Sequence, residues 1–113
     1  MAHAILLSDP EASARREEFV SLAMAALSAR DLGPALDLAE EAKKVGKEGS
    51  TAQLEALAAA LAAVARAGAS SEERTADVAA ARHDLARAAV HQLEANASTQ
   101  LALETMLIKM RAV

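Results

Sequence analysis

The chain has 113 residues, of which 53% are hydrophobic and 25% are charged, and its formal net charge is −4. This length suits a single domain with one core over residues 1–113. The lack of cysteine excludes disulfides and thiol chemistry, and the absence of a basic patch or an aromatic platform argues against a nucleic-acid partner.

The hydrophobic fraction consists mainly of alanine, and Phe19 is the only aromatic residue. Alanine is the strongest helix former, and residues that favour strands are scarce, so the composition predicts an all-α fold with a thin core. The apolar start of the chain lacks the basic region of a signal peptide, and no apolar run is long enough to cross a bilayer. We therefore expect a soluble, cytoplasmic protein without a membrane partner.

A first helix is predicted over about residues 10–30. Ser8-Asp9-Pro10-Glu11 provides a capping residue, a proline for the first turn and an acid at the positive end of the helix dipole. The expected inner residues are Ala12, Phe19, Ala23 and Ala26, flanked by Leu22 and Leu27.

A second helix is predicted over about residues 34–45, after a tight turn at Asp31-Leu32-Gly33. Gly46 and Gly49 bracket its end. The residues expected to be buried on this helix are Ala35, Leu38, Ala39, Ala42 and Val45.

The third predicted helix, about residues 51–67, has no clear solvated face. Ser50 and Gln53 match a capping box at its start, and Gly68 ends it. One face contains Leu54, Leu57, Leu61 and Val64, and the opposite face contains Ala56, Ala59, Ala60, Ala63 and Ala67. One interpretation is that the alanines are exposed and serve only to favour helix formation. The other is that this helix contacts a second copy of the chain or a helical partner.

The fourth helix is predicted to run unbroken over about residues 71–111, with a capping box at Ser70 and Glu73. Its apolar face keeps the same phase throughout and collects Val78, Leu85, Ala89, Leu93, Leu103, Leu107 and Met110. A break at residues 96–99 is the alternative, because these residues are mediocre helix formers. Together the patterns predict an antiparallel four-helix bundle with a long C-terminal helix.

The main candidate site is a polar interruption of this apolar face by Asn96, Gln100 and Glu104, spaced four residues apart. Polar groups on a core-facing stripe need hydrogen-bond partners. We expect them to line a core pocket for a small organic ligand, or else to form a structural polar network. In a further alternative the protein is a catalyst that uses Glu104 as a general base for proton abstraction.

Histidine offers a weaker candidate for chemistry. His83 in alanine-rich surroundings is compatible with haem ligation, whereas His91 lies on the predicted outer face, and neither belongs to a Glu-x-x-His pair. The preferred interpretation is that both are exposed, with no metal site and no cofactor.

Two resemblances bear on the fold. Phe19, Leu22 and Ala23, followed by Ala35 and Ala39, occupy positions similar to those of a tetratricopeptide-like hairpin, over residues 15–47 only. The strong caps, short glycine-marked loops and Ala/Glu/Lys/Arg helix surfaces also resemble idealised, de novo designed helical bundles. The polar interruption at Asn96, Gln100 and Glu104 favours non-enzymatic ligand binding, with protein–protein interaction or self-assembly as the alternative.

Overall fold

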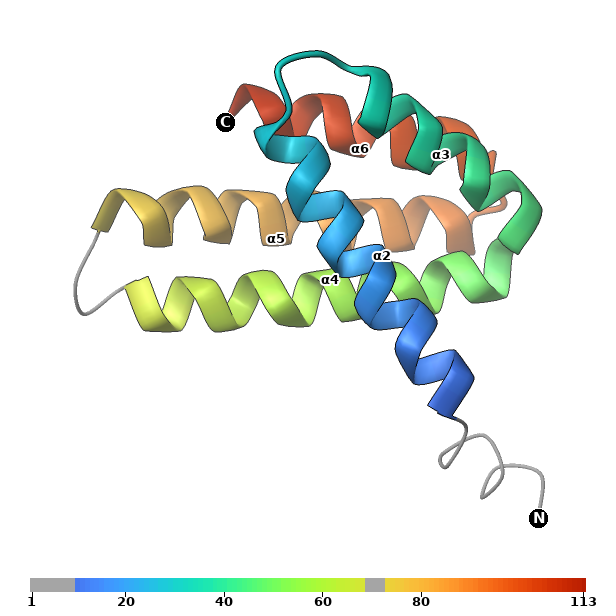
Figure 1. Cartoon of the computed structure of the whole chain (residues 1–113), viewed down its shortest axis with the longest axis horizontal. Helices are drawn as coiled ribbons and strands as arrows, with labels where there is room; N and C mark the ends of the chain where they lie inside the picture. Colours follow the sequence, from blue (N-terminus) through green and yellow to red (C-terminus); the bar gives the residue numbers. More distant parts are fainter. Residues whose placement is uncertain (1–9, 69–72) are drawn as a thin grey trace.

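The computed structural model describes residues 10–68 and 73–113, and these residues form five helices and no strand (Figure 1). The helices are α2 (Pro10–Ser28), α3 (Gly33–Val45), α4 (Lys47–Gly68), α5 (Glu73–Glu94) and α6 (Thr99–Ala112). The all-α prediction is confirmed for the described residues. The caps predicted at Ser8-Asp9 and at Ser70 lie outside them.

The longest feature is the antiparallel pair formed by α4 and α5 (Figure 1). α6 packs against both α5 and α3, and α2 crosses the pair obliquely while contacting α4, α3 and α6. Small residues let α4 and α5 approach closely at one end: a Cβ added to Gly68 would lie 3.2 Å from the backbone nitrogen of Ala76. Among the described helices, none combines the length and hydropathy needed to cross a membrane.

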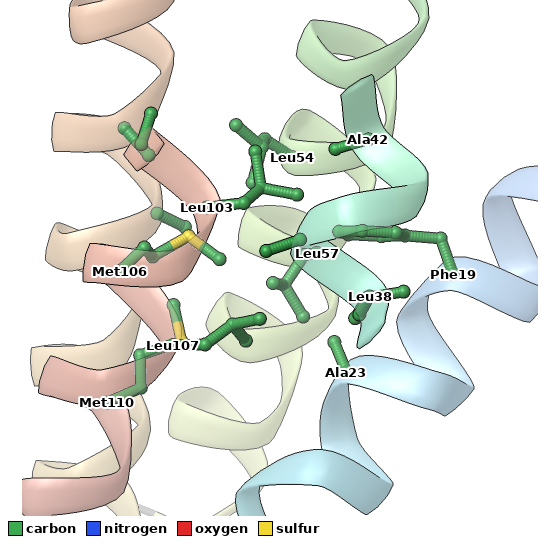
Figure 2. Close-up of a cluster of buried hydrophobic side chains, with 14 of the residues drawn as sticks. Phe19, Ala23, Leu38, Ala42, Leu54, Leu57, Leu103, Met106, Leu107 and Met110 are labelled. Carbon is green, nitrogen blue, oxygen red and sulfur yellow. The ribbon is translucent and has the colours of Figure 1, made fainter. Parts of the chain in front are cut away.

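One continuous cluster of buried apolar side chains holds the five helices together (Figure 2). Phe19 of α2 and Leu57 of α4 meet Leu103, Leu107 and Met110 of α6 in this cluster. Buried alanines such as those at positions 23, 39 and 86 surround the larger side chains, so the helices pack at short range. Alanine therefore contributes much of the described core, as the composition predicts.

The prediction of one helix over residues 71–111 is wrong, and the fold has five described helices rather than four. α5 ends at Glu94, and Asn96 has a positive φ of 67°. The amide of Ala97 donates to the Gln92 carbonyl at 2.9 Å, and that of Asn96 to the Leu93 carbonyl at 3.0 Å. This is the Schellman motif, in which asparagine tolerates the left-handed conformation.

A new helix starts immediately after this turn. The hydroxyl of Ser98 accepts a hydrogen bond from the Leu101 amide at 3.3 Å and thus caps α6. The apolar face keeps its phase across the break because α5 and α6 cover the same core, where Leu93 and Leu103 are both fully buried. The alternative break at residues 96–99 is confirmed.

The start of the third predicted helix is also corrected. α4 begins at Lys47 rather than near residue 51, and Ser50 is a buried residue inside it instead of its cap. The Ser50 hydroxyl donates to the Ala42 carbonyl of α3 at 3.3 Å. Gly46, with a φ of 89°, lets the chain turn from α3 into α4 within one residue.

Arginine side chains satisfy the exposed carbonyls at two helix ends. Nη1 of Arg111 donates to the carbonyls of Ala26 and Ala29, at 2.6 and 2.8 Å, where α2 ends. Nε of Arg82 donates to the carbonyl of Met110 at 3.1 Å, in the last turn of α6. Because the last carbonyls of a helix lack partners within it, these bonds tie α2 and α5 to α6.

Candidate functional site

The three polar residues of the predicted ligand site do not share one buried helix face. Asn96 is exposed in the turn between α5 and α6, where its Oδ1 accepts a hydrogen bond from Lys47 Nζ at 2.9 Å. Gln100 and Glu104 are half-buried on α6. The expected core pocket relied on an unbroken helix, and the turn at Asn96 removes that geometry. Ligand binding by these side chains stays a prediction, as does the role of Glu104 as a base.

The histidines lie at the surface of α5. His83 Nδ1 is 3.6 Å from Asp84 Oδ1, and the His83 side chain is 34% exposed. His91 Nδ1 is 3.3 Å from Glu94 Oε1. Among the described residues there is no group of three potential metal-ligating side chains. Haem ligation by His83 stays untested.

The alanine-rich surface of the third predicted helix, residues 51–67, is divided in the structure. Ala56 and Ala60 face α2 across a shallow hollow. Ala59, Ala63 and Ala67 are exposed on α4. The small side chains on the α2 side thus allow α2 to cross α4 closely, and the exposed alanines leave the prediction of a homo-oligomer or helical partner open.

A groove lies between α2 and the junction of α3 with α4. Its first part, about 290 Å³, has a floor of the buried Phe19, Leu38 and Ala42. Leu22 and Val45 form its apolar walls and are 49% and 44% exposed. The expectation that Val45 is buried is therefore wrong, because the last turn of α3 leaves the core beside Gly46.

The second part of this groove extends toward the start of α2. It has a volume of about 460 Å³ and reaches Ala12 and Ala52. Both parts are lined by Arg15, Val45 and Gln53, so they form one surface, here called the α2 groove. From Ala12 to Leu22 the groove follows eleven residues of α2, which corresponds to about 15 Å along a helix.

The charges that line the α2 groove differ between its two parts. Arg16 lines the part near Ala12 and Arg15 lines both parts, and no acidic residue of the described chain lines the part near Ala12. Glu18 and Glu41 line the part near Leu22. The part of the groove near Ala12 is therefore basic, and the part near Leu22, which Arg15 also lines, has a net acidic lining around its apolar floor.

Surface ion pairs compensate these charges only partly. Arg15 Nη1 lies 3.9 Å from Glu11 Oε2, and Glu41 Oε1 lies 3.2 Å from Lys44 Nζ. All four side chains are at least 63% exposed, and exposed pairs of this kind contribute little free energy. The groove charges thus remain able to attract a charged partner.

Sequence reasoning missed this groove because it treated the two helices separately. Leu22 was assigned to the flank of the inner stripe and Val45 to the core, whereas their joint exposure depends on how α2 and α3 cross. The charged residues at positions 15, 16, 18 and 41 are visible in the sequence, but their arrangement around one groove requires the tertiary fold.

Comparison with known proteins yields no match to a family model, to a curated protein or to a solved structure. The resemblances to a tetratricopeptide-like hairpin over residues 15–47 and to designed bundles therefore stay predictions.

Proposed function

We propose that this protein is a helical interaction module that binds a short amphipathic helix of a partner protein in the α2 groove. The observation that carries the proposal is the continuous groove with an apolar floor, half-exposed Leu22 and Val45 on its walls, and a lining that is basic near Ala12 and net acidic near Leu22. Binding an amphipathic helix in an apolar groove is a recurrent mode of recognition.

The dimensions of the groove favour a helical segment. A length of about 15 Å accommodates roughly ten residues of helix, of which two or three apolar side chains would contact the floor. Exposed leucine and valine side chains that become buried on binding are the expected source of affinity. The partner surface therefore carries apolar residues at intervals of three and four.

The charges of the groove predict how this segment is oriented. Acidic residues of the partner would lie near Arg15 and Arg16, and basic residues near Glu18 and Glu41. Complementary charges chiefly set the association rate and the orientation, whereas the apolar contacts set most of the affinity. A segment with the reverse charge order would place like charges together at both ends.

A pair of synthetic helical peptides tests the proposal. Both have about twelve residues, roughly 18 Å of helix, with leucines on one face. The first carries lysines in its first turn and glutamates in its last turn, and the second has these charges exchanged. Because the second arrangement suits the helix dipole better, it is the more stable isolated helix. If the first peptide binds more tightly, its helix stability as a free peptide therefore cannot be the cause.

The orientation is read from a spin label placed at one end of each peptide. We expect the glutamate end of either peptide to broaden the amide resonances around Arg16, whichever terminus carries the glutamates. If the glutamate end instead broadens the amide resonances around Leu22 in both titrations, the predicted orientation is contradicted. If neither peptide binds, the proposed function is overturned.

Matched substitutions locate the binding surface. Leu22→Ala should weaken peptide binding about five- to tenfold, because a side chain buried in the interface is truncated. Leu101→Ala is the control, since Leu101 is 62% exposed on α6 and does not line the groove. Equal losses in both variants would contradict the assignment. Light scattering at several concentrations adds a second criterion, since a dimer that Leu22→Ala dissociates would assign the groove to a second copy.

A further inference from the structure

A second concave surface lies where α2 crosses the α4–α5 pair, and it has a volume of about 320 Å³. Its apolar walls come from three helices: Met24 of α2, Leu61 and Val64 of α4, and Val78 of α5. Arg74 and Arg82 of α5 also line it. This surface, here called the Arg82 pocket, shares no lining residue with the α2 groove.

Arg82 brings a positive charge into apolar surroundings. Its side chain is half-buried, and burial lowers the pKa of the guanidinium by desolvation. Arginine nevertheless keeps its charge at any physiological pH. A charge that has lost part of its hydration is stabilised by an opposite charge within contact distance.

The described part of the chain provides no such counter-charge. Arg82 forms no ion pair with a carboxylate of these residues. Its Nε bonds to the Met110 carbonyl, and its two Nη groups donate no hydrogen bond to a described residue. Since no buried side-chain nitrogen there lacks a partner, these Nη groups are accessible from the pocket or from solvent. Two such Nη groups can donate hydrogen bonds to both oxygens of one carboxylate.

Arg74 adds a second positive charge at the pocket. It is exposed and lies eight residues before Arg82 on the same helix, about 12 Å along the axis. Asp77 accompanies Arg74 in an adjoining hollow but does not line the Arg82 pocket. Among the described residues, the pocket thus combines apolar walls with guanidinium groups and is lined by no carboxylate.

We infer that the Arg82 pocket binds a small organic anion with an apolar body, its carboxylate or sulfonate on the Nη groups of Arg82 and its chain along Met24, Leu61 and Val64. The volume lies near the lower end of the range of small-molecule sites, roughly 300–1,000 Å³, which suits a medium-chain acid rather than a long lipid. This binding is independent of the α2 groove.

Calorimetric titration with decanoate, below its critical micelle concentration, tests the inference. Decanol has the same chain without the charge, and acetate has the charge without the chain. We expect decanoate to bind with one site per chain and at least about tenfold more tightly than either comparator, because the ionic hydrogen bonds and the apolar contacts both contribute. Equal binding of decanol and decanoate, or no binding of decanoate, overturns the inference.

Substitutions place the anion at Arg82. Arg82→Gln should weaken decanoate binding at least about tenfold, and Arg87→Gln, which removes an exposed arginine outside the pocket, should leave it within twofold. Because Arg82 also bonds to α6, Val64→Glu provides a second test with that bond intact. It adds a carboxylate to the pocket lining and should weaken decanoate binding at least about tenfold more than Val64→Gln, which loses the same apolar contact without adding a charge. The assignment is overturned if Arg82→Gln binds decanoate within twofold of Arg87→Gln and Val64→Glu binds it within twofold of Val64→Gln.

Discussion

Substitution of Asn96 changes the free energy of unfolding, and the sign of that change distinguishes the turn between α5 and α6 from a continuous helix. In a helix interior, Asn96→Ala would stabilise the protein by up to about 0.7 kcal/mol through the higher helix propensity of alanine. In the structure, Asn96 has a φ of 67°. A residue with a Cβ in this left-handed conformation costs roughly 1–2 kcal/mol, and the asparagine side chain reduces that cost.

We therefore expect Asn96→Ala to reduce the free energy of unfolding by about 1 kcal/mol, which lowers Tm by about 4–8 °C for a domain of about this size. The hydrogen bond from Lys47 adds little because it is exposed. Asn96→Gly should stay within about 0.5 kcal/mol of the parent, since glycine adopts the positive φ freely but also gains entropy in the unfolded chain.

Far-UV circular dichroism is the suitable assay for these variants, because the chain contains neither tryptophan nor tyrosine. Urea and thermal unfolding should give the same order of stabilities. Ser98→Ala removes the α6 cap and should also destabilise, by about 0.5–2 kcal/mol. Thr105→Ala is the control: it lies exposed within α6 and should stabilise by a few tenths of a kcal/mol. Stabilisation by both Asn96→Ala and Ser98→Ala would refute the turn.

Three further predictions concern the packing of the helices, and each is measured as a change in the free energy of urea unfolding. Leu57→Ala should cost about 2–5 kcal/mol because the side chain is fully buried, whereas Leu101→Ala should cost less than about 0.5 kcal/mol; similar losses would contradict the core assignment. Arg111→Gln should cost about 1.5–3 kcal/mol through its two charged hydrogen bonds to the end of α2, with Lys109→Gln as the neutral control; equal stabilities of these two variants would show that the bonds contribute nothing. Ser50→Ala should cost about 0.5–1.5 kcal/mol, because the Ser50 hydroxyl bonds within the core to the end of α3; an unchanged or higher stability would exclude that bond as a contributor.

Helix periodicity and composition were sufficient to predict the all-α class and most of the core. Phe19, Ala23, Leu38, Leu57 and Leu103 are buried as their spacing indicates. These positions follow from local rules, because an amphipathic helix buries its apolar stripe wherever it packs. The turn around Gly33 and Pro34 likewise placed the end of α2 and the bounds of α3 to within a few residues.

The errors arose where two local signals competed. The constant phase of the apolar face outweighed the weak helix propensity of residues 96–99, although Asn96 and Ser98 supply a C-terminal and an N-terminal cap. Ser50 matched a capping box, yet the helix starts earlier and buries its hydroxyl against α3. In both cases the sequence pattern fits two structures, and tertiary packing selects between them.

The candidate sites depend on helix crossings that no single-helix pattern contains. Leu22 and Val45 form one groove only because α2 crosses α3 beside the α3–α4 turn. Arg82 reads as an ordinary surface arginine in its own helix, and its apolar surroundings come from α2 and α4. Sequence reasoning from one chain identifies such residues only as exposed or polar positions.

The most direct test of the proposed interaction module is a nuclear magnetic resonance titration of the isotope-labelled full chain with the lysine-first amphipathic peptide. We predict that the largest amide shift changes lie at Arg15, Leu22, Val45 and Gln53, which line the α2 groove. The resonance of Leu101 on α6 should move little. Shift changes centred on α6, or none at saturating peptide, would contradict the account.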